Sequence, residues 1–298
     1  MIYHCPKKSC DSSTKLKSVI KDGVYLRKCD SRKVQRFKCK ICGKRFSRST
    51  HTLEYRQKKR RVNYMLYKLI CSGNSMRRCS RILGINYKTV ARKVDYLAEK
   101  SRRRQEKLLT ELQKSKVERM QFDDLITLEH TKMKPLAVSL AVDKDRRIIL
   151  GAEVSRIPAF GHLVKKSVKK YGYRENHHIR GLNRLFLKIQ KTVSTDALIE
   201  SDEHKTYPAL VNQYFHTSEY KRYKGGRGCV AGQGELKKQV FDPLFTLNHT
   251  CAMMRDSINR LIRKTWCTTK KVSRLQNHID IFISFYNRDY LNINLTPI

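Results

Sequence analysis

The sequence predicts a chain of mixed α and β structure that is built from three successive parts. Three observations lead to this prediction. Two pairs of cysteines frame the first part, a helical spacing of apolar residues runs from 62 to 100, and stretches of strand-like and helical periodicity follow one another from 117 onward. We therefore expect parts at 1–50, 51–104 and 105–298.

Four cysteines organise the first part. They form a pair separated by four residues and a pair separated by two, with a basic, strand-like stretch between them. This spacing is typical of a zinc ribbon, in which four thiolates bind a structural Zn²⁺ and replace the core that so short a segment cannot build. The expected zinc ligands are Cys5, Cys10, Cys39 and Cys42. Cys29 is left over, His4 is an alternative ligand, and scattered free cysteines in a basic arm are the alternative to a metal site.

The sequence of residues 51–104 predicts a charged linker followed by a helix-turn-helix motif. A short helix over Met76–Leu83 is followed by the turn Gly84–Asn86 and by a second helix that begins near Tyr87. The start of this second helix carries polar and basic side chains, as a recognition helix in the major groove of DNA does. The residues expected to contact DNA are Lys88, Thr89, Arg92 and Lys93. A three-helix bundle without DNA binding has the same apolar pattern.

The charge of the chain indicates a polyanionic partner. The formal net charge is +39; residues 1–104 hold 31 Lys and Arg against 6 Asp and Glu, and residues 105–298 hold 34 against 20. We expect double-stranded DNA as the partner and the N-terminal third as its main contact. The sequence shows no run of about eighteen apolar residues and no apolar core of a signal peptide. We therefore expect a soluble cytoplasmic protein that binds no membrane. The ten cysteines are then expected to bind metal rather than to form disulfides.

The third part alternates between strand and helix patterns. The expected strands lie at 117–130, 136–143, 147–155, in the segment that ends at Asp202, and at 218–224. The expected helices lie at 179–191, 207–215, 243–266 and 272–290. A Gly-rich basic loop separates the last strand from the long helix.

Two acidic doublets stand out in this basic chain. Asp123 and Asp124 lie in the first strand, and Asp202 and Glu203 follow the apolar end of a later one. Carboxylates on neighbouring strands can share a divalent cation, so Asp123 and Asp202 are candidate ligands of Mg²⁺ or Mn²⁺. Asp124 would replace Asp123 if the strand register slipped by one residue. Alternatively, Asp123 is a solvated acid and Asp202 caps the helix that begins near Tyr207.

The order of these parts and their motifs resembles the small DDE transposases of bacterial insertion sequences. The motifs are CPKKSC with CKICGKRFS, the strand MQFDDL, SDEHKTY around Asp202, and INRLIRKTWCTTKKV near the C-terminus. The order of strands and helices is similar to that of a ribonuclease-H-like catalytic core. The resemblance covers nearly the whole chain, and the order of the motifs is more specific than any single one.

This resemblance assigns the first catalytic acid to Asp123 and the second to Asp202. In the family the third acid is a Glu early in the long C-terminal helix, and alignment of NRLIRKT puts Asn248, beside His249, at that place. Glu235 lies 33 positions after Asp202, close to the usual interval of the family, but within the Gly-rich loop. The third ligand is thus Glu235, Asn248 or His249, unless the site has decayed and Asn248 and His249 only cap the helix.

The resemblance implies a transposase that binds terminal inverted repeats and catalyses DNA cleavage and strand transfer. The implied chemistry is metal-dependent phosphoryl transfer with Mg²⁺ or Mn²⁺. The implied assembly is a homodimer or higher oligomer that holds two DNA ends in a synaptic complex. The alternative is a decayed transposase, or a non-enzymatic regulator that keeps the zinc ribbon and the helix-turn-helix.

Overall fold

The computed structural model describes residues 4–11, 18–28, 30–224, 242–262 and 267–293. Contacts divide the chain into two compact units, Met1–Leu66 and Tyr67–Ile298. Helix α1 (Asn63–Ile70) crosses the boundary between them. Among the described helices, none is long and apolar enough to span a membrane.

The first unit contains a small antiparallel sheet with the strand order β1-β2-β3. Its strands are β1 (Val19–Arg27), β2 (Arg32–Cys39) and β3 (Arg45–Ser47). The rings of Phe37 and Phe46, both buried, lie 5.7 Å apart between β2 and β3. So small an apolar core needs further stabilisation, which in modules of this size commonly comes from a metal.

The second unit begins with helices whose ends follow from local capping. In α2 (Met76–Ile82) the Ser75 hydroxyl accepts the N–H of Arg78 at 3.2 Å, and in α3 (Tyr87–Leu112) the Asn86 side chain accepts the N–H of Lys88 at 2.8 Å. The two helices correspond to those expected from the sequence. However, α3 continues without a break past the part boundary expected at 104 and 105. The leucines near its end pack into the core beneath the large sheet, namely Leu108, Leu109 and Leu112.

A five-stranded mixed sheet forms the centre of the second unit, with the order β6-β5-β4-β7-β8. The strands are β4 (Val117–Glu129), β5 (Thr131–Asp143), β6 (Ile149–Arg156), β7 (Val193–Asp202) and β8 (Glu219–Tyr223). Strands β4, β5 and β6 pair antiparallel, whereas β7 is parallel to β4 and β8 is parallel to β7. The prediction of a mixed α/β fold is confirmed.

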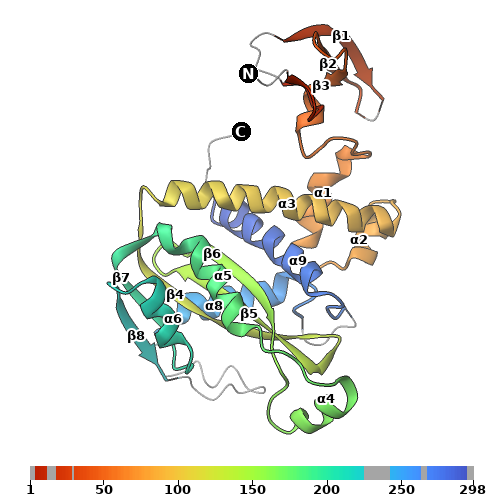
Figure 1. The fold of residues 1–298 in the computed structure, drawn as a ribbon. Coiled ribbons are helices and arrows are strands. Elements are labelled where there is room, and N and C mark those ends of the chain that lie inside the picture. The colour runs from red at the N-terminus through yellow and green to blue at the C-terminus, as the bar shows by residue number, and fades with distance from the viewer. Residues whose placement is uncertain (1–3, 12–17, 29, 225–241, 263–266, 294–298) are drawn as a thin grey trace. The chain divides into compact units, whose positions relative to one another are not determined.

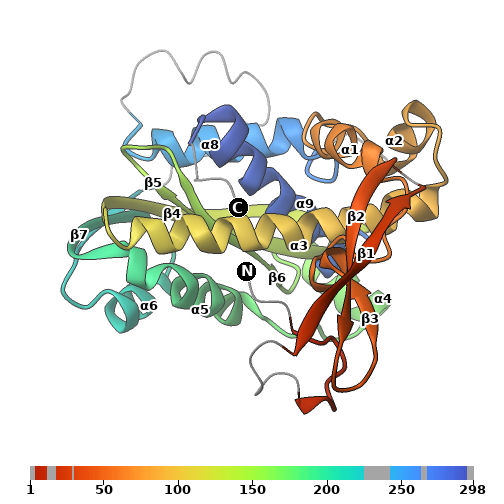
Figure 2. The same ribbon diagram turned by 90° about the horizontal axis from the view of Figure 1, so that it is seen from above.

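Helices cover both faces of this sheet, as Figures 1 and 2 show. One face packs on α5 (His178–Ile189), α6 (Tyr207–Tyr214) and the end of α3, and the other on α8 (Phe245–Ser257) and α9 (Val272–Phe285), which continues as a π-helix (Tyr286–Tyr290). Successive side chains of a strand point to opposite faces. Accordingly, Phe122 of β4 belongs to the first core and Leu125 to the second.

Two helices differ from the expectation. The helix expected over 243–266 ends at Ser257, so the prediction of one long helix is wrong. Its end is fixed by the N–H of Gly73, which donates to the Ser257 carbonyl at 2.8 Å, and by the extended backbone of Ile258. The structure also contains α4 (Leu163–Tyr171), which the sequence patterns did not predict.

Candidate functional site

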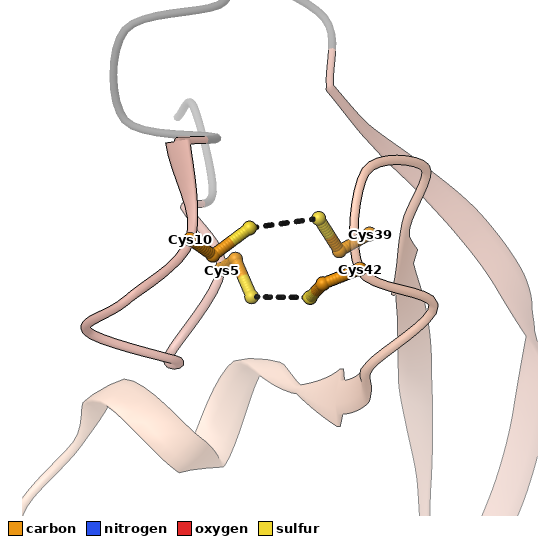
Figure 3. A group of neighbouring side chains, drawn as sticks. All are labelled: Cys5, Cys10, Cys39 and Cys42. Atoms are coloured by element: carbon orange, nitrogen blue, oxygen red, sulfur yellow. Dashed lines mark hydrogen bonds between the residues drawn. The ribbon is translucent and has the colours of Figure 1, made fainter.

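The four cysteines of the first unit come together as predicted, and Figure 3 shows their side chains converging from two loops. All four sulfur atoms lie within 4.8 Å of one another. The Sγ atoms of Cys5 and Cys42 are 3.5 Å apart, and those of Cys10 and Cys39 are 3.7 Å apart. A tetrahedral site with Zn–S bonds of about 2.3 Å places its sulfurs about 3.8 Å apart, so this cluster fits a structural zinc ion.

Local backbone geometry shapes the second cysteine loop. The N–H of Gly43 donates to the Cys39 carbonyl at 3.0 Å, and the N–H of Cys39 donates to the Lys44 carbonyl at 3.0 Å. Gly43 has φ of +70°, a conformation that glycine adopts without strain. The hydrogen bond from the backbone of Cys42 lowers the pKa of the Cys39 thiol to about 7, which favours the thiolate that binds metal. Cys29 lies outside the described residues, and His4 is exposed.

The second candidate site is the acid pair, Asp123 and Asp202, in the large sheet. Strands β4 and β7 pair in parallel with Gln121 opposite Glu200, and two more residues in this register set Asp123 opposite Asp202. The side chains of Gln121 and Glu200 form a 3.0 Å hydrogen bond. Because side chains alternate along a strand, Asp123 and Asp202 share that face of the sheet. The predicted proximity of these two acids therefore agrees with the register.

Asp123 is half-buried, so it is not a fully solvated acid. Burial, and then the charge of Asp202, raise the pKa of its carboxyl to about 7. Its Oδ1 accepts the N–H of Asp124 at 2.6 Å and the Tyr207 hydroxyl at 3.3 Å. Within the described residues, no donor is assigned to its Oδ2. A half-buried carboxylate beside a second one, with an oxygen that accepts no hydrogen bond from the described residues, is suited to a cation.

Asp124 has a different environment, because its carboxylate accepts three hydrogen bonds from side chains. The donors are the Ser139 hydroxyl at 2.5 Å, the Tyr207 hydroxyl at 2.8 Å, and Nε2 of His178, which also forms an ion pair with it when protonated. Burial opposes the charge of Asp124, but the His178 contact and the two hydroxyls hold its pKa below the ordinary value. Its oxygens are thus occupied by protein donors, and the register puts Asp123 rather than Asp124 opposite Asp202.

Close packing brings the three donors to Asp124. Tyr207 is the first residue of α6, and burial raises its pKa well above the ordinary value, so its hydroxyl stays protonated and donates. His178 is the first residue of α5, which lies so near β6 that a Cβ on Gly181 would be 2.9 Å from the Ser155 Cβ. The sequence analysis missed these donors. The only signal for them in the sequence was that two aspartates are adjacent. Because side chains alternate along a strand, one of the two must lie on the opposite face of the sheet, where it needs donors.

Helix α8 runs beside the acid pair. The N–H of Leu247 donates to the Gln121 side chain at 3.2 Å, which fixes the first turn of α8 near the residue two positions before Asp123. Burial raises the pKa of the Cys251 thiol to about 12, and the charge of Asp123 adds to this rise. Asn248 precedes Cys251 by three residues and therefore lies on a similar side of the helix.

Of the three candidates for the third catalytic position, the structure describes Asn248 and His249. Asn248 is exposed, and its Nδ2 donates to Oδ2 of Asp242 at 2.8 Å. The other oxygen of Asp242 accepts the N–H of Leu244 at 2.9 Å at the start of α8. His249 is half-buried, with its ring stacked 6.0 Å from Phe245. Glu235 lies outside the described residues. Asp202 does not cap α6, whose N-cap is Thr206.

The residues expected to contact DNA differ in their exposure to solvent. Lys88 and Arg92 are exposed and Thr89 is half-buried, all on the first turns of α3. Lys93 is only 3% exposed, because it lies on the same helix face as Val90 and Leu97, so the expectation that it faces a partner is wrong. The exposed arginines of α2 extend the basic surface, and they are Arg77, Arg78 and Arg81.

A comparison with known proteins adds no identification. No protein-family model matches the chain, and no curated protein matches its sequence. The functional interpretation therefore depends on the residues and their geometry.

Proposed function

We propose that the protein is a DDE-type transposase of an insertion sequence, which cleaves DNA and transfers strands in a metal-dependent reaction. The observation that carries this proposal is the acid pair: Asp123 and Asp202 lie on neighbouring parallel strands, and Asp123 is half-buried and repelled by its partner. Burying two like charges together is unfavourable unless a cation neutralises them, so such a pair marks a functional site more often than a structural one.

The strand order supports the proposal. The sheet has the order β6-β5-β4-β7-β8, and only β5 runs against the other strands. This mixed order supports the proposal of the ribonuclease-H-like core that the resemblance implies. The first acid lies on the central strand β4 and the second at the end of the adjacent β7. Helix α8, where that core carries its third ligand, runs beside the pair.

In this proposal each residue of the site has a separate task. Asp123 and Asp202 hold the divalent cation, whereas Asp124, bound to His178 and Tyr207, fixes the backbone of β4 next to it. When bound, Mg²⁺ or Mn²⁺ supplies the positive charge that activates a water or 3′-hydroxyl nucleophile and stabilises the leaving oxygen. Asn248, whose side chain donates a hydrogen bond to Asp242, is a described candidate for a third ligand.

The remaining parts supply DNA binding. Residues 1–66 hold 20 Lys and Arg against 4 Asp and Glu, and the zinc-binding cysteines give this module its fold. A groove in the module is lined by basic and aromatic side chains, including Arg36, Lys44 and Tyr55. The exposed residues of α2 and α3 add a second basic surface. Basic surfaces of this extent bind the phosphate backbone and position the protein on duplex DNA.

The proposal is tested by a cleavage assay on linear duplexes that carry the terminal repeats flanking the coding sequence, with Mg²⁺ or Mn²⁺. Asp202→Asn is expected to abolish cleavage and to leave duplex binding intact, because an amide keeps the shape of the carboxylate but not its charge. The control is Glu203→Gln, which removes the same charge from the next, exposed residue and should retain activity. Full cleavage by the Asp202 variant would refute the proposal.

One observation favours a non-catalytic alternative: the residue at the expected third position is Asn248 rather than a carboxylate. A regulator that kept only the DNA-binding parts would bind the repeats and cut none of them. Binding of terminal-repeat DNA by the wild-type protein without cleavage in either metal would establish that alternative.

A further inference from the structure

The segment between β6 and α5, residues 157–173, carries a surface that the acid pair does not use. We call it the aromatic-basic arm. It contains four lysines and no acid. Its helix α4 has a single buried residue, Ser167. Large apolar side chains of the arm stand in solvent instead, and they are Phe160, Val164, Val168, Tyr171 and Tyr173.

The arm is anchored at one end of the large sheet, and Figure 1 shows α4 projecting there. Ser167 donates to the Met133 carbonyl of β5 at 2.7 Å, and Lys134 of β5 lies 4.0 Å from the centre of the Tyr171 ring. At its base, Arg174 donates to Glu129, the last residue of β4, at 3.0 Å. Strands β4 and β7 are parallel, and β4 continues past the end of β7 at Asp202. The arm therefore lies beyond the carboxyl end of β7, about 20 Å along β4 from Asp123.

The chain itself connects the arm to the acid pair. Tyr173, which is 86% exposed, precedes His178 by five residues, and His178 binds Asp124. Five residues span at most about 17 Å when fully extended. A strand of DNA at the acid pair therefore lies within a few nucleotides of the arm.

The side chains of the arm fit nucleic acid better than a second copy of the chain. Val164, Val168 and Tyr171 follow a helical spacing on α4, and lysines flank this stripe at positions 165, 166, 169 and 170. Two copies of the arm would oppose lysine to lysine, which disfavours self-association. A polyanion satisfies the lysines, and exposed aromatic rings stack on bases.

Unpaired bases fit this arm better than a duplex. In a duplex the faces of the bases are covered by their neighbours, so only the lysines would gain contacts. A strand with unpaired bases offers both phosphates to the lysines and open faces to the rings. Phe160 and Tyr173 lie outside α4, on either side of it, and are 62% and 86% exposed.

We propose that the aromatic-basic arm binds unpaired nucleotides of the DNA strand that reaches the acid pair. Phe160 and Tyr173 stack on bases, and the four lysines contact the flanking phosphates. This role rests on the proposed function, since it requires that DNA be opened or cut at Asp123 and Asp202. It adds a binding surface for the strand that carries the reactive end.

The test measures binding of the full-length protein to a labelled single-stranded oligonucleotide and to the duplex of the same sequence, by fluorescence anisotropy. Salt at about 0.2 M weakens phosphate contacts elsewhere on this basic chain. Phe160→Ala with Tyr173→Ala is expected to weaken single-strand binding roughly tenfold or more and to change duplex binding little. The control Leu187→Ala removes an apolar side chain on α5 that is 57% exposed and should leave single-strand binding unchanged. Tyr173→Trp keeps an aromatic ring and should keep full binding.

Two further measurements locate the contact. Replacing the four lysines by glutamine is expected to reduce the slope of log K against log salt for single strands by up to about 3. Irradiation of the complex with an oligonucleotide that contains 5-iodouracil is expected to crosslink Phe160 or Tyr173, as identified by mass spectrometry. Crosslinks only to residues of the first unit would overturn the proposal.

The outcomes separate this inference from the proposed function. If the wild-type protein binds DNA and the double variant binds single strands equally well, the arm has no such role, while the proposed function stands. If the wild-type protein binds neither single nor double strands, both fail. If the double variant keeps its DNA binding but loses binding to vesicles of phosphatidylserine, the arm contacts membranes and the inference is wrong.

Discussion

Replacing Asp123 by asparagine is expected to stabilise the protein at pH 8 when magnesium and manganese are absent, although the residue is half-buried. The folded protein keeps a proton on this carboxyl up to about pH 7, because burial and the charge of Asp202 disfavour its ionised form. In the unfolded chain the same group releases its proton near the ordinary value of 3.8. Ionisation of Asp123 in the folded state therefore opposes folding, and asparagine cannot ionise.

The size of the effect follows from the two pKa values. The difference between about 7 and 3.8 corresponds to about 4 kcal/mol in the free energy of unfolding. The unfolded state binds fewer protons than the folded state between these pH values, so the stability of the wild-type protein falls as pH rises from about 4 to about 7. At pH 8 the variant should thus be more stable by up to about 4 kcal/mol, and at pH 5 by much less.

The measurement is urea unfolding followed by hydrogen exchange of peptides from β4, which reports on the second unit alone. The control is Asp124→Asn, the adjacent residue with the opposite expectation. The pKa of Asp124 is lowered, so its charge stabilises the fold above its ordinary pKa. Loss of its hydrogen bonds from His178 and the two hydroxyls should cost at least about 2 kcal/mol at pH 8. Millimolar Mg²⁺ should stabilise the wild-type protein and not the Asp123 variant.

Two results would refute this reasoning. One is destabilisation by Asp123→Asn at pH 8 that equals that of Asp124→Asn, since the two residues would then have the same environment. The other is an effect of Asp123→Asn that is the same at pH 5 and pH 8, since the carboxyl would then not titrate between them.

Three more predictions concern the other residues of the two sites. Cys39→Ser is expected to lower bound zinc from one equivalent to nearly none, as measured by atomic emission. The control Cys79→Ser changes a buried cysteine outside the cluster and should keep one equivalent. A full equivalent of zinc in the Cys39 variant would exclude the four-cysteine site. Tyr207→Phe removes the hydroxyl that donates to both aspartates of β4 and should cost about 2 kcal/mol in urea unfolding at pH 8. If Asn248 and Asp242 together supply the third ligand, Asn248→Ala and Asp242→Asn should each reduce cleavage at least about tenfold, and unchanged cleavage in both would assign that role elsewhere.

Much of the large sheet was predictable because its strands carry a strong period. The strand expected at 117–130 is β4, which ends at Glu129, and the hairpin expected after it is β5 and β6. The start of α3 was equally clear, since the expected turn Gly84–Asn86 directly precedes it. In these places the local pattern and the tertiary environment favour the same structure.

The errors lie where tertiary contacts decide. The end of α8 at Ser257 depends on the N–H of Gly73, which is far away in sequence. Helix α4 was missed because a helix with one buried residue lacks the apolar face by which helices are predicted. Likewise, Lys93 looked like a recognition residue, although the period of α3 turns it toward the core.

The sequence predicted the two acids of the candidate site but not the side chains that donate hydrogen bonds to them. One carboxylate within the first strand and one at the end of a later strand were enough to suggest that Asp123 and Asp202 meet. The partners of Asp124 come from helices α5 and α6 and from β5, and no local spacing relates His178 or Tyr207 to β4. Only the packed fold brings them within hydrogen-bonding distance.

The continuity of α3 sets a fixed length between two regions of the second unit. Its 26 residues begin at the exposed Lys88 turn and end among leucines beneath the sheet. A straight helix of that length measures about 39 Å, close to eleven base pairs of B-form DNA at about 3.4 Å each. If the start of α3 grips a duplex, the rigid helix rather than a flexible linker separates that contact from the core under the sheet. Under the proposed function, inserting or deleting one turn of α3 would then shift the cutting position along the duplex.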